Sequence, residues 1–382
     1  MKPRLLALSG LAPWPLRGGF SVRTAHLLEH LAKDWTITLL VACRLDRGAV
    51  PLDESGGHTV IEAPVPGRWT PVPGLRTDFG PLARALDDAL RATKPRAALL
   101  FNGTEFLALD HDAFPPAVVD RVDSGALERL RYLRRGKPLR WPKTAWEFLR
   151  EIRYERRIVR GLEATIVAGE DDRRMLRRLS GRSTLHVISN GVEAAPLPDF
   201  AAESPRPTVA FTGTLSYHAN IDAAVYFARC LWPSIRDRVG DARLIIAGRD
   251  PARRVVALGE IAGVEVRENV EDMSAVLREA WIAVAPMRCG TGVKNKVLEA
   301  WAVGRPAVMT PIATNGLRLD ADTSTLVAGT RADFCDRIVR LLADPEARHR
   351  CGRACHTLVR TRHSWTQSAD AVSRLLGTVS RS

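Results

Sequence analysis

A glycine-rich turn, two lysines and a glutamate follow one another closely in the segment CGTGVKNKVLEAWAVGRPAV, at residues 289–308. The pattern predicts a loop and then a helix that starts at about Val293. Lys296 and Glu299 are three residues apart, so they share one face near the amino end of this helix. Free N–H groups at such an end attract phosphate, and a lysine adds a full positive charge. A carboxylate can accept hydrogen bonds from ribose hydroxyls. The spacing therefore suits a nucleoside diphosphate.

An exposed ion pair is the alternative interpretation of Lys296 and Glu299, because such pairs are common at this spacing. Two other loops favour a ligand. The turn Gly213-Thr214 ends a predicted strand in FTGTLSYHANID, where a glycine allows a diphosphate to approach the backbone closely. Arg249 ends the neighbouring strand in IIAGRDP, and a guanidinium suits phosphate. We expect both loops at the crevice beyond the strand ends, where α/β sheets bind ligands.

A third loop lies in the first half of the chain. Gly18 and Gly19 follow the first predicted strand in PWPLRGGFSVRTAHLLEHL. We expect this loop to face the second half of the chain across the same crevice. Each of the three loops also has a simpler interpretation as turn chemistry, so their convergence is what favours a ligand.

Short apolar segments alternate with helical periodicity along the whole chain. Strands are expected at residues 5–9, 35–43, 97–101, 117–122, 164–168, 184–189, 208–214, 242–248, 264–266, 281–286, 307–310 and 325–329. Continuous apolar strands separated by helices indicate parallel sheets that are covered on both faces. The sequence therefore predicts an α/β protein of two doubly wound, Rossmann-like domains that face each other across a cleft.

The alternation stops once, at residues 193–207. This stretch, EAAPLPDFAAESPRP, contains four prolines and lacks periodicity, which is typical of a linker. The predicted division is a first domain at 1–192, this linker, a second domain at 208–362, and a final helical segment at 363–382.

Positive charge is concentrated between Arg129 and Arg182, where 17 Lys and Arg residues stand against 7 Asp and Glu residues. Four arginines at helical spacing form a basic stripe there: Arg150, Arg153, Arg157 and Arg160. Apolar residues fall largely on another face: Phe148, Leu149, Ile152 and Val159. One interpretation is a solvated helix face; the other is a surface for acidic lipid headgroups or a phosphate-bearing substrate. Nucleic acid fits less well, because the aromatic residues do not interleave with the basic ones.

The composition fits two folded domains, with 382 residues, 46% apolar residues and a net charge of +13. No apolar run approaches the roughly 20 residues that span a bilayer. The N-terminus, MKPRLLALSGLA, is interpreted as a first strand rather than an export signal, because Pro13 and Pro15 interrupt the apolar stretch. The six scattered cysteines fit a reducing cytoplasm and form no metal-binding pair. We expect a cytoplasmic protein, with the inner membrane face as the alternative, and no metal or cofactor.

Several motifs together resemble the GT-B-fold retaining glycosyltransferases of family 4, which use nucleotide sugars. Within that family the chain is most similar to the bacterial branch associated with exopolysaccharide and cell-surface sugar assembly. The most specific motif is GTGVKNKVLEAWAVGRPAV. Its companions occur in the expected order over nearly the whole chain: GGFSVRTAHLLEHLA, VVDRVDSGALERL (118–130), VISNGVE (187–193), TGTLSYHANIDAAVYF (212–227) and RHSWTQSADAV (362–372).

The resemblance implies a glycosyltransferase that moves a sugar from a nucleotide diphosphate sugar to a hydroxyl acceptor, with retention of configuration and without a metal. The products implied are polysaccharides, glycolipids or glycosylated metabolites. The resemblance also implies an acceptor-side first domain, a donor-binding second domain, and a helix at 363–382 that crosses back to the first domain.

Site residues follow from the same resemblance. Lys296 matches the lysine that contacts the donor phosphates, and Glu299 matches the glutamate that holds the ribose. Gly18 and Gly19 match the acceptor-side loop, and Asp123 falls where many members keep a histidine beside the anomeric carbon. The predicted catalytic residues are Asp123, Lys296 and Glu299. The predicted donor-binding residues are Gly213, Thr214, Arg249, Thr291, Gly292, Val293, Lys294, Asn295, Lys296 and Glu299.

The sequence departs from the family pattern at three positions. Thr291 stands where the family has the first of two glutamates, and Thr214 and Asn220 stand where many members have arginine and lysine. Arg249 or Lys294 could supply the missing positive charge. These departures bear on the identity of the donor sugar more than on the fold.

Two other functional classes stay open. A sugar-nucleotide 2-epimerase has the same architecture, and a fold does not settle a function. A basic protein that binds an anionic surface or nucleic acid would use the segment from Arg129 to Arg182 instead. Asp123 also has a second interpretation, as a strand-end residue that bonds to the local backbone.

Overall fold

The structure is a computed structural model. It describes residues 2–16, 18–45, 50, 52, 57–64, 80–101, 114–134, 141–181, 184–194, 200 and 203–381. The chain forms two compact units, which are described separately below. The first unit comprises Met1–Ala126, Trp146–Ile188 and Trp365–Ser382, and the second comprises Leu127–Ala145 and Ser189–Ser364. In the predicted linker at 193–207, residues 195–199, 201 and 202 lie outside the described ranges.

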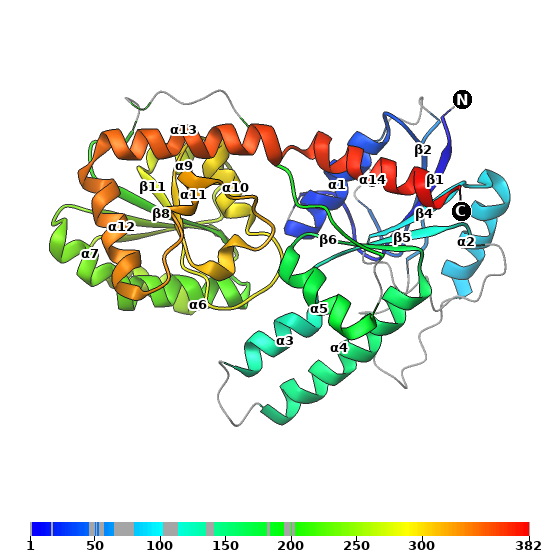
Figure 1. The fold of residues 1–382 in the computed structure, drawn as a ribbon, viewed down its shortest axis with the longest axis horizontal. Coiled ribbons are helices and arrows are strands. Elements are labelled where there is room, and N and C mark those ends of the chain that lie inside the picture. The colour runs from blue at the N-terminus through cyan, green and yellow to red at the C-terminus, as the bar shows by residue number, and fades with distance from the viewer. Residues whose placement is uncertain are drawn as a thin grey trace. The chain divides into compact units, whose positions relative to one another are not determined.

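The first unit is built on seven parallel strands in the order β3-β2-β1-β4-β5-β6-β7 (Figure 1). The strands are β1 (Arg4–Ser9), β2 (Thr36–Val41), β3 (Thr59–Glu62), β4 (Ala97–Phe101), β5 (Ala117–Val122), β6 (Ala164–Val167) and β7 (Leu185–Val187). The helices are α1 (Gly19–Leu31), α2 (Gly80–Thr93), α4 (Trp141–Gly161), α5 (Glu170–Ser180) and α14 (Trp365–Val379). Helix α3 (Gly125–Leu133) starts in this unit and continues in the second, and the first residues of α4, up to Ala145, also belong to the second unit.

Helices cover both faces of this sheet, as the continuous apolar strands predict. Leu5 and Ala7 of β1 pack in one core with α1 and α14, whereas Leu6 and Leu8 pack in another with α2 and α4. This alternation follows from the two-residue period of a strand. Figure 1 shows α14 lying beside α1, and the indole of Trp35 donates a hydrogen bond to Ser373 at 3.0 Å.

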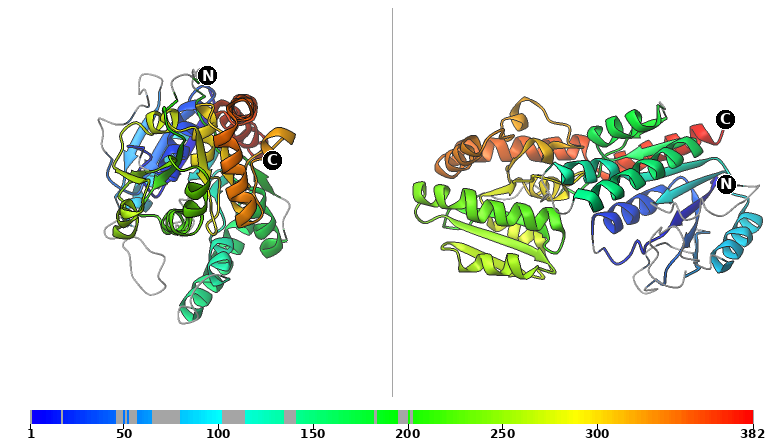
Figure 2. Two further views of the ribbon diagram at one scale, coloured as in Figure 1. Left: turned by 90° about the vertical axis from the view of Figure 1, so that its left-hand side faces the viewer. Right: turned by 90° about the horizontal axis from the view of Figure 1, so that it is seen from below.

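The second unit has five parallel strands in the order β10-β9-β8-β11-β12. The strands are β8 (Thr208–Thr214), β9 (Arg243–Arg249), β10 (Val264–Glu268), β11 (Ile282–Ala285) and β12 (Ala307–Met309). The helices are α6 (His218–Tyr226), α7 (Trp232–Arg238), α8 (Arg253–Val256), α9 (Met273–Glu279), α10 (Asn295–Ala302), α11 (Ala321–Ser324), α12 (Arg331–Ala343) and α13 (Pro345–Arg362). Short π or 3-10 turns lie at Phe227–Leu231, Ala257–Glu260 and Pro311–Thr314. Figure 2 shows helices on both sides of this sheet.

Both sheets have a point at which the strand order reverses, next to β1 in the first unit and next to β8 in the second. This arrangement is that of doubly wound, Rossmann-like folds, so the predicted fold class is confirmed for each unit. Ligands of such folds bind beyond the carboxyl ends of the strands at the reversal point. In the second unit that place is defined by the loops that follow β8 and β11.

One predicted strand is wrong. Residues 325–329 form no strand, and Val327 makes only an isolated bridge to Met309. The side chain of Asp320 caps α11 directly before this segment, and the side chain of Thr330 caps α12 directly after it. The segment pairs with β12 at this one residue, because the Met309 amide donates to the Leu326 carbonyl at 2.9 Å and the Ala328 amide donates to the Met309 carbonyl at 2.8 Å. Strand β3 was not predicted, because its four residues carry too little pattern.

A close contact between two glycines holds β8 beside β9. Gly213 lies opposite Gly248 in the register of the two strands, and a Cβ atom on Gly248 would overlap the Gly213 carbonyl group. We expect Gly248→Ala to lower the free energy of unfolding by about 1–3 kcal/mol, as overpacking does elsewhere. The measurement is urea unfolding of the whole chain.

Gly240→Ala is the matched control, because a Cβ atom there would meet nothing within 4 Å. Equal unfolding midpoints for the two variants would contradict the assigned contact between the strands.

Candidate functional site

The loop after β11 is shaped by two glycines in left-handed conformations. Gly290 has φ +92° and Gly292 has φ +67°, values that residues with a side chain rarely adopt. Lys294 is buried, and its ammonium donates hydrogen bonds to the carbonyl oxygens of Thr291 at 2.5 Å and Gly292 at 3.1 Å. The side chain of Lys294 therefore holds the loop that precedes α10.

Helix α10 begins at Asn295, two residues later than predicted. Lys294 occupies the N-cap position with φ −90° and ψ 89°, outside the helical region. Val293 thus belongs to the loop. Asn295 accepts a hydrogen bond at 2.7 Å from the side-chain amide of Asn190. Gly304, with φ +74°, lies just beyond the helix, where the sequence predicted its end.

Lys296 is the central residue of the site, and only 8% of its side chain is exposed. Its ammonium donates a hydrogen bond to the Asn220 side-chain oxygen at 2.8 Å and lies 3.9 Å from the centre of the Phe211 ring. The Asn220 amide in turn donates to the Thr214 carbonyl at 2.9 Å, which orients the asparagine oxygen toward the lysine. Burial, followed by the charge of Lys294, lowers the pKa of Lys296 to about 7.

Gly213 makes room for this arrangement. Its φ is +142°, and a Cβ atom there would lie 3.0 Å from the Asn220 amide nitrogen and 3.1 Å from the Lys296 ammonium. A larger residue would push both groups away from the end of β8. The Gly213-Thr214 turn and Lys296, which are distant in the sequence, therefore meet at one point of the fold.

Glu299 lies on the same side of α10, one turn after Lys296, and is half-buried. Burial raises the pKa of its carboxyl, whereas the positive charges of Lys296 and Arg249 oppose this rise. Arg249 is exposed at the end of β9, where it lies opposite Thr214 in the strand register. Lys296, Glu299 and Arg249 thus share one electrostatic environment at the point of strand reversal.

The sequence did not identify several residues that surround these loops. In the second unit, Tyr217 donates a hydrogen bond to Glu128 of α3 at 2.8 Å, and Arg131 of α3 donates to the Gly290 carbonyl at 2.7 Å. Burial would raise the pKa of Glu128, but hydrogen bonds from His218 and Tyr217 lower it below its usual value. No local sequence pattern links these positions, since more than 80 residues separate α3 from its partners.

Asn220 is another residue that the sequence did not assign to the site. It was noted only as a departure from the family pattern, yet it is the hydrogen-bond partner of Lys296. Its position in the first turn of α6, just after the Gly213-Thr214 turn, was the one signal available.

The remaining predicted residues belong to the first unit. Gly18 precedes α1 in an extended conformation, and a Cβ atom there would meet nothing within 4 Å, so packing alone does not require a glycine. Gly19 is the first residue of α1. Asp123 follows β5 and is half-buried. These three residues therefore belong to the first unit, whereas the predicted donor-binding residues belong to the second.

A buried ion pair joins α1, which follows Gly18, to β5, which precedes Asp123. The guanidinium of Arg23 donates to the Asp120 carboxylate at 2.7 and 2.9 Å, and neither side chain is more than 1% exposed. A two-bonded pair of this kind fixes α1 to the end of β5. The segment that starts at Gly18 and the segment that ends at Asp123 are therefore tied to each other.

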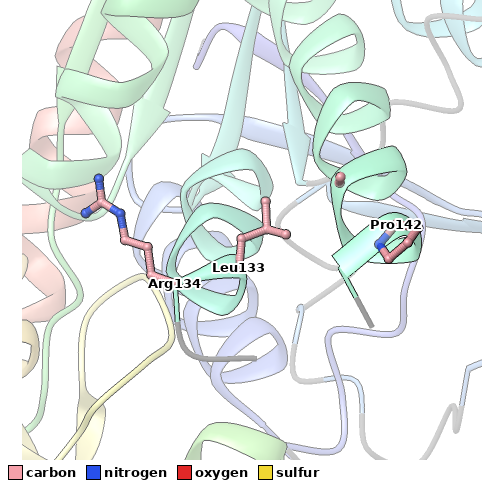
Figure 3. A pocket seen from close by; sticks show the side chains of 4 residues that line it. Leu133, Arg134 and Pro142 are labelled. Atoms are coloured by element: carbon pink, nitrogen blue, oxygen red, sulfur yellow. The ribbon is translucent and has the colours of Figure 1, made fainter. Parts of the chain in front are cut away.

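A cavity of about 600 Å³ lies elsewhere in the second unit and contains none of the predicted site residues. Leu133, Arg134, Pro142 and Ala145 line it. Figure 3 shows Leu133 at the end of α3, Arg134 directly after it, and Pro142 on α4. Residues 135–140, which connect these two helices, lie outside the described ranges, so the cavity adds nothing to the site.

The described residues contain neither a cluster of metal ligands nor a helix that could span a membrane. These ranges contain no group of three or more His, Cys, Asp or Glu residues that could hold a metal ion. Nor does any helix within them combine the length and the apolar character needed to cross a bilayer. None of the six cysteines, all of which lie within the described ranges, forms a disulfide.

The chain resembles known proteins in sequence over one region and in fold over its whole length. Residues 206–344 match the family described as glycosyl transferases group 1. No protein of curated function matches the sequence. Sucrose-phosphate synthase from Thermosynechococcus elongatus has a similar structure, with a TM-score of 0.75 and 16% identity, over 98% of this chain and 99% of that one.

Two further solved structures are similar. HepE from Anabaena in complex with UDP-glucose has a TM-score of 0.66 and 12% identity, over 98% of this chain and 99% of that one. WaaG, a glycosyltransferase involved in lipopolysaccharide biosynthesis, has a TM-score of 0.67 and 11% identity, over 97% and 99% of the two chains. At such identities these likenesses concern the fold, which is that of the GT-B glycosyltransferases.

The region matched in sequence contains β8, β9 and α10, and so it contains Lys296, Glu299 and Arg249. The geometry and the sequence match therefore agree on the same part of the molecule. Residues 206–344 are similar to the group 1 glycosyltransferases, and this match supports a transferase enzyme.

Proposed function

We propose that this enzyme transfers a sugar from a nucleotide diphosphate sugar to a hydroxyl acceptor in the synthesis of polysaccharides, glycolipids or glycosylated metabolites. The observation that carries the proposal is the buried ammonium of Lys296, held by Asn220 beside Gly213 at the point of strand reversal. The complex of the similar HepE with UDP-glucose supports a donor of this class. Retention of configuration and independence of metal ions rest on the resemblance to family 4.

The proposed donor site stabilises the leaving diphosphate. Lys296 and the amino end of α10 supply positive charge and N–H groups where negative charge develops. Arg249 is the second cation, because it is exposed at the strand end beside Thr214. Lys294 acts through the loop, since its ammonium bonds to the Thr291 and Gly292 carbonyl oxygens.

Glu299 is proposed to accept hydrogen bonds from the ribose hydroxyls. Its raised pKa reflects burial, and hydroxyl donors would replace the water that the carboxylate has lost. Thr291 contributes a hydroxyl where the family has a carboxylate, which implies a different pattern of contacts to the donor sugar. In the first unit, Asp123 is proposed to orient the acceptor hydroxyl or to stabilise positive charge on the sugar, and Gly18 and Gly19 to border the acceptor.

A screen of nucleotide sugars tests this proposal. The donors are first ranked by the thermal stabilisation that they give, and UDP-glucose is included because a similar protein binds it. Mass spectrometry of the products then separates transfer or hydrolysis, which release the nucleotide diphosphate, from 2-epimerisation, which retains the nucleotide sugar. With the selected donor, we expect Lys296→Ala and Glu299→Ala each to lower kcat by about 10²–10³-fold, as loss of one stabilising group does in other enzymes.

Arg254→Ala and Glu260→Ala are the matched controls, because both residues are exposed and lie outside the site. Circular dichroism and thermal unfolding establish that each variant is folded. Wild-type turnover by folded Lys296→Ala and Glu299→Ala proteins would show that the site is assigned to the wrong residues.

The affinity for UDP should depend on pH because the pKa of Lys296 is about 7. Below this pKa the ammonium is charged and attracts the diphosphate, and above it the neutral amine does not. We therefore expect the Kd for UDP to rise between pH 7 and pH 9, by up to about tenfold per pH unit. Isothermal titration calorimetry at fixed ionic strength measures this change.

Lys296→Arg is the control for this prediction, since a guanidinium stays charged throughout the same range. An equal rise of Kd in that variant would assign the pH dependence to another group.

A second proposal concerns an anionic membrane surface. Trp146 and Leu149 of α4 are each 56% exposed, and Arg153 and Arg157 are exposed on the same side of this helix. Leu149 was predicted among residues that fall largely on another face than the basic stripe, but it lies one turn before Arg153 on the same side of α4. Apolar side chains next to arginines are typical of helices that lie in a membrane interface.

We expect salt-sensitive binding to vesicles that contain phosphatidylglycerol and none to vesicles of phosphatidylcholine alone. Arg153→Glu with Arg157→Glu should weaken sedimentation with anionic vesicles by at least about tenfold, because each basic residue contributes about 1 kcal/mol near such a surface. The control is Arg253→Glu with Arg254→Glu, the same charge change on exposed residues of α8. Equal binding of wild-type protein to neutral vesicles would refute the proposal.

A further inference from the structure

The backbone is strained directly before Asp123. Val122, the last residue of β5, has φ +65°, and the Asp123 amide donates a hydrogen bond to the Arg121 carbonyl at 2.7 Å. Together these features define a γ-turn of the strained kind, with a β-branched residue at its centre. The register between β5 and β6 shifts between Asp120 and Val122. Strain of this kind persists only where the surrounding structure holds it.

Two buried carboxylates hold the residue after the turn. The Ser124 amide donates to Asp172 of α5 at 2.9 Å, and the Ser124 hydroxyl donates to Glu155 of α4 at 2.9 Å. The Ala126 amide also donates to Glu155, at 3.5 Å. Ser124, Glu155 and Asp172 are each at most 1% exposed. The segment from residue 124 to 126 is therefore fixed from two helices.

The position of Glu155 is unfavourable for a charged group. Burial raises the pKa of Glu155 to about 7, although the charge of Arg121 and the hydrogen bond from Ser124 act in the opposite direction. Arg121 lies 3.7 Å from Glu155 and 3.6 Å from Glu151. A core made only of apolar residues would avoid this cost, so the carboxylate is retained for the bonds that it makes.

Asp123 itself is only half-buried, although its neighbours on both sides are tied to the core. The Val122 carbonyl accepts a hydrogen bond from the Ala168 amide at 2.6 Å, which anchors the turn to the end of β6. The bonds hold the backbone and leave the Asp123 side chain at the carboxyl edge of the sheet. That arrangement suits a carboxylate that must keep a fixed position while it meets a ligand.

We infer that Glu155 and Asp172 are positioning residues for the transfer reaction, which hold the strained turn at Val122 and thereby fix Asp123. The inference rests on the proposed role of Asp123. Neither residue needs to touch a substrate, because both act through Ser124. The turn is a rigid support for one carboxylate rather than an ordinary strand end.

Hydrogen–deuterium exchange tests the holding of the turn without reference to activity. In Glu155→Ala, we expect the amides of residues 123–126 to exchange at least about tenfold faster than in the wild type, because two hydrogen bonds are lost. Glu155→Gln keeps an acceptor for the Ser124 hydroxyl and should stay close to the wild-type rate. Unchanged exchange in Glu155→Ala would overturn the inference.

Turnover tests the positioning. With UDP-glucose, or the donor that the screen selects, we expect Glu155→Ala to lower kcat by about 10²-fold, as small misplacements of reacting groups do. The Kd for UDP should not change, because the donor residues lie in the other unit. Glu155→Gln should restore most of kcat. Faster exchange with unchanged kcat in Glu155→Ala would refute the positioning role.

Glu151→Ala is the matched control, because Glu151 lies one turn earlier on α4 and pairs with the same Arg121. It should keep wild-type exchange and turnover. Should Glu155→Ala fail to fold, Ser124→Ala removes the same hydrogen bond from its other end and gives the same two readouts. A loss of kcat in Glu155→Ala but not in Lys296→Ala would refute the donor site and leave this inference standing.

Discussion

The site depends on one constraint. The ammonium of Lys296 is held in a buried position, where the loss of water disfavours its positive charge. The Lys296 ammonium lies among Phe211, Asn220 and the end of β8, and burial lowers its pKa to about 7. A lysine in this state gains more from an anionic ligand than an exposed lysine does, because it has already lost its water. In the proposed donor site, the cost of burying the amine in the unliganded protein is therefore the source of the attraction for phosphate. Asn220 keeps the ammonium in place until a ligand arrives.

The rest of the second unit can be understood from this constraint. Gly248 allows β9 to lie against the Gly213 carbonyl, and Gly213 leaves room for Asn220 and Lys296. Lys294 holds the loop before α10 through two carbonyl oxygens, so that Lys296 emerges in the first turn of the helix at a fixed point. Small residues and a second lysine thus serve the position of one charge, and the strand order places that charge where Rossmann-like sheets bind ligands.

The first unit uses buried charge in a different way. Buried polar contacts flank Asp123 in the sequence. Asp120, before it, pairs with Arg23, and Ser124, after it, bonds to Glu155 and Asp172. Buried ionic groups are weak contributors to stability, but they constrain geometry, because each bond works only over a narrow range of distance and angle. The proposed site residues in both units are consequently supported by polar groups in the interior rather than by apolar packing alone.

The sequence by itself determined the α/β class, nearly all strands, and the placement of Lys296 and Glu299 on one face of one helix, because these follow from local periodicity and spacing. It failed at residues 325–329, which lie between two capped helices and pair with β12 at Val327 alone, and at Leu149, which lies on the same side of α4 as Arg153. Only the tertiary structure decided that Asn220 bonds to Lys296, that Gly213 makes space for both, and that Glu155 holds Ser124. These contacts join residues that are far apart in the sequence, and a pKa shift caused by burial exists only once the fold has removed the water.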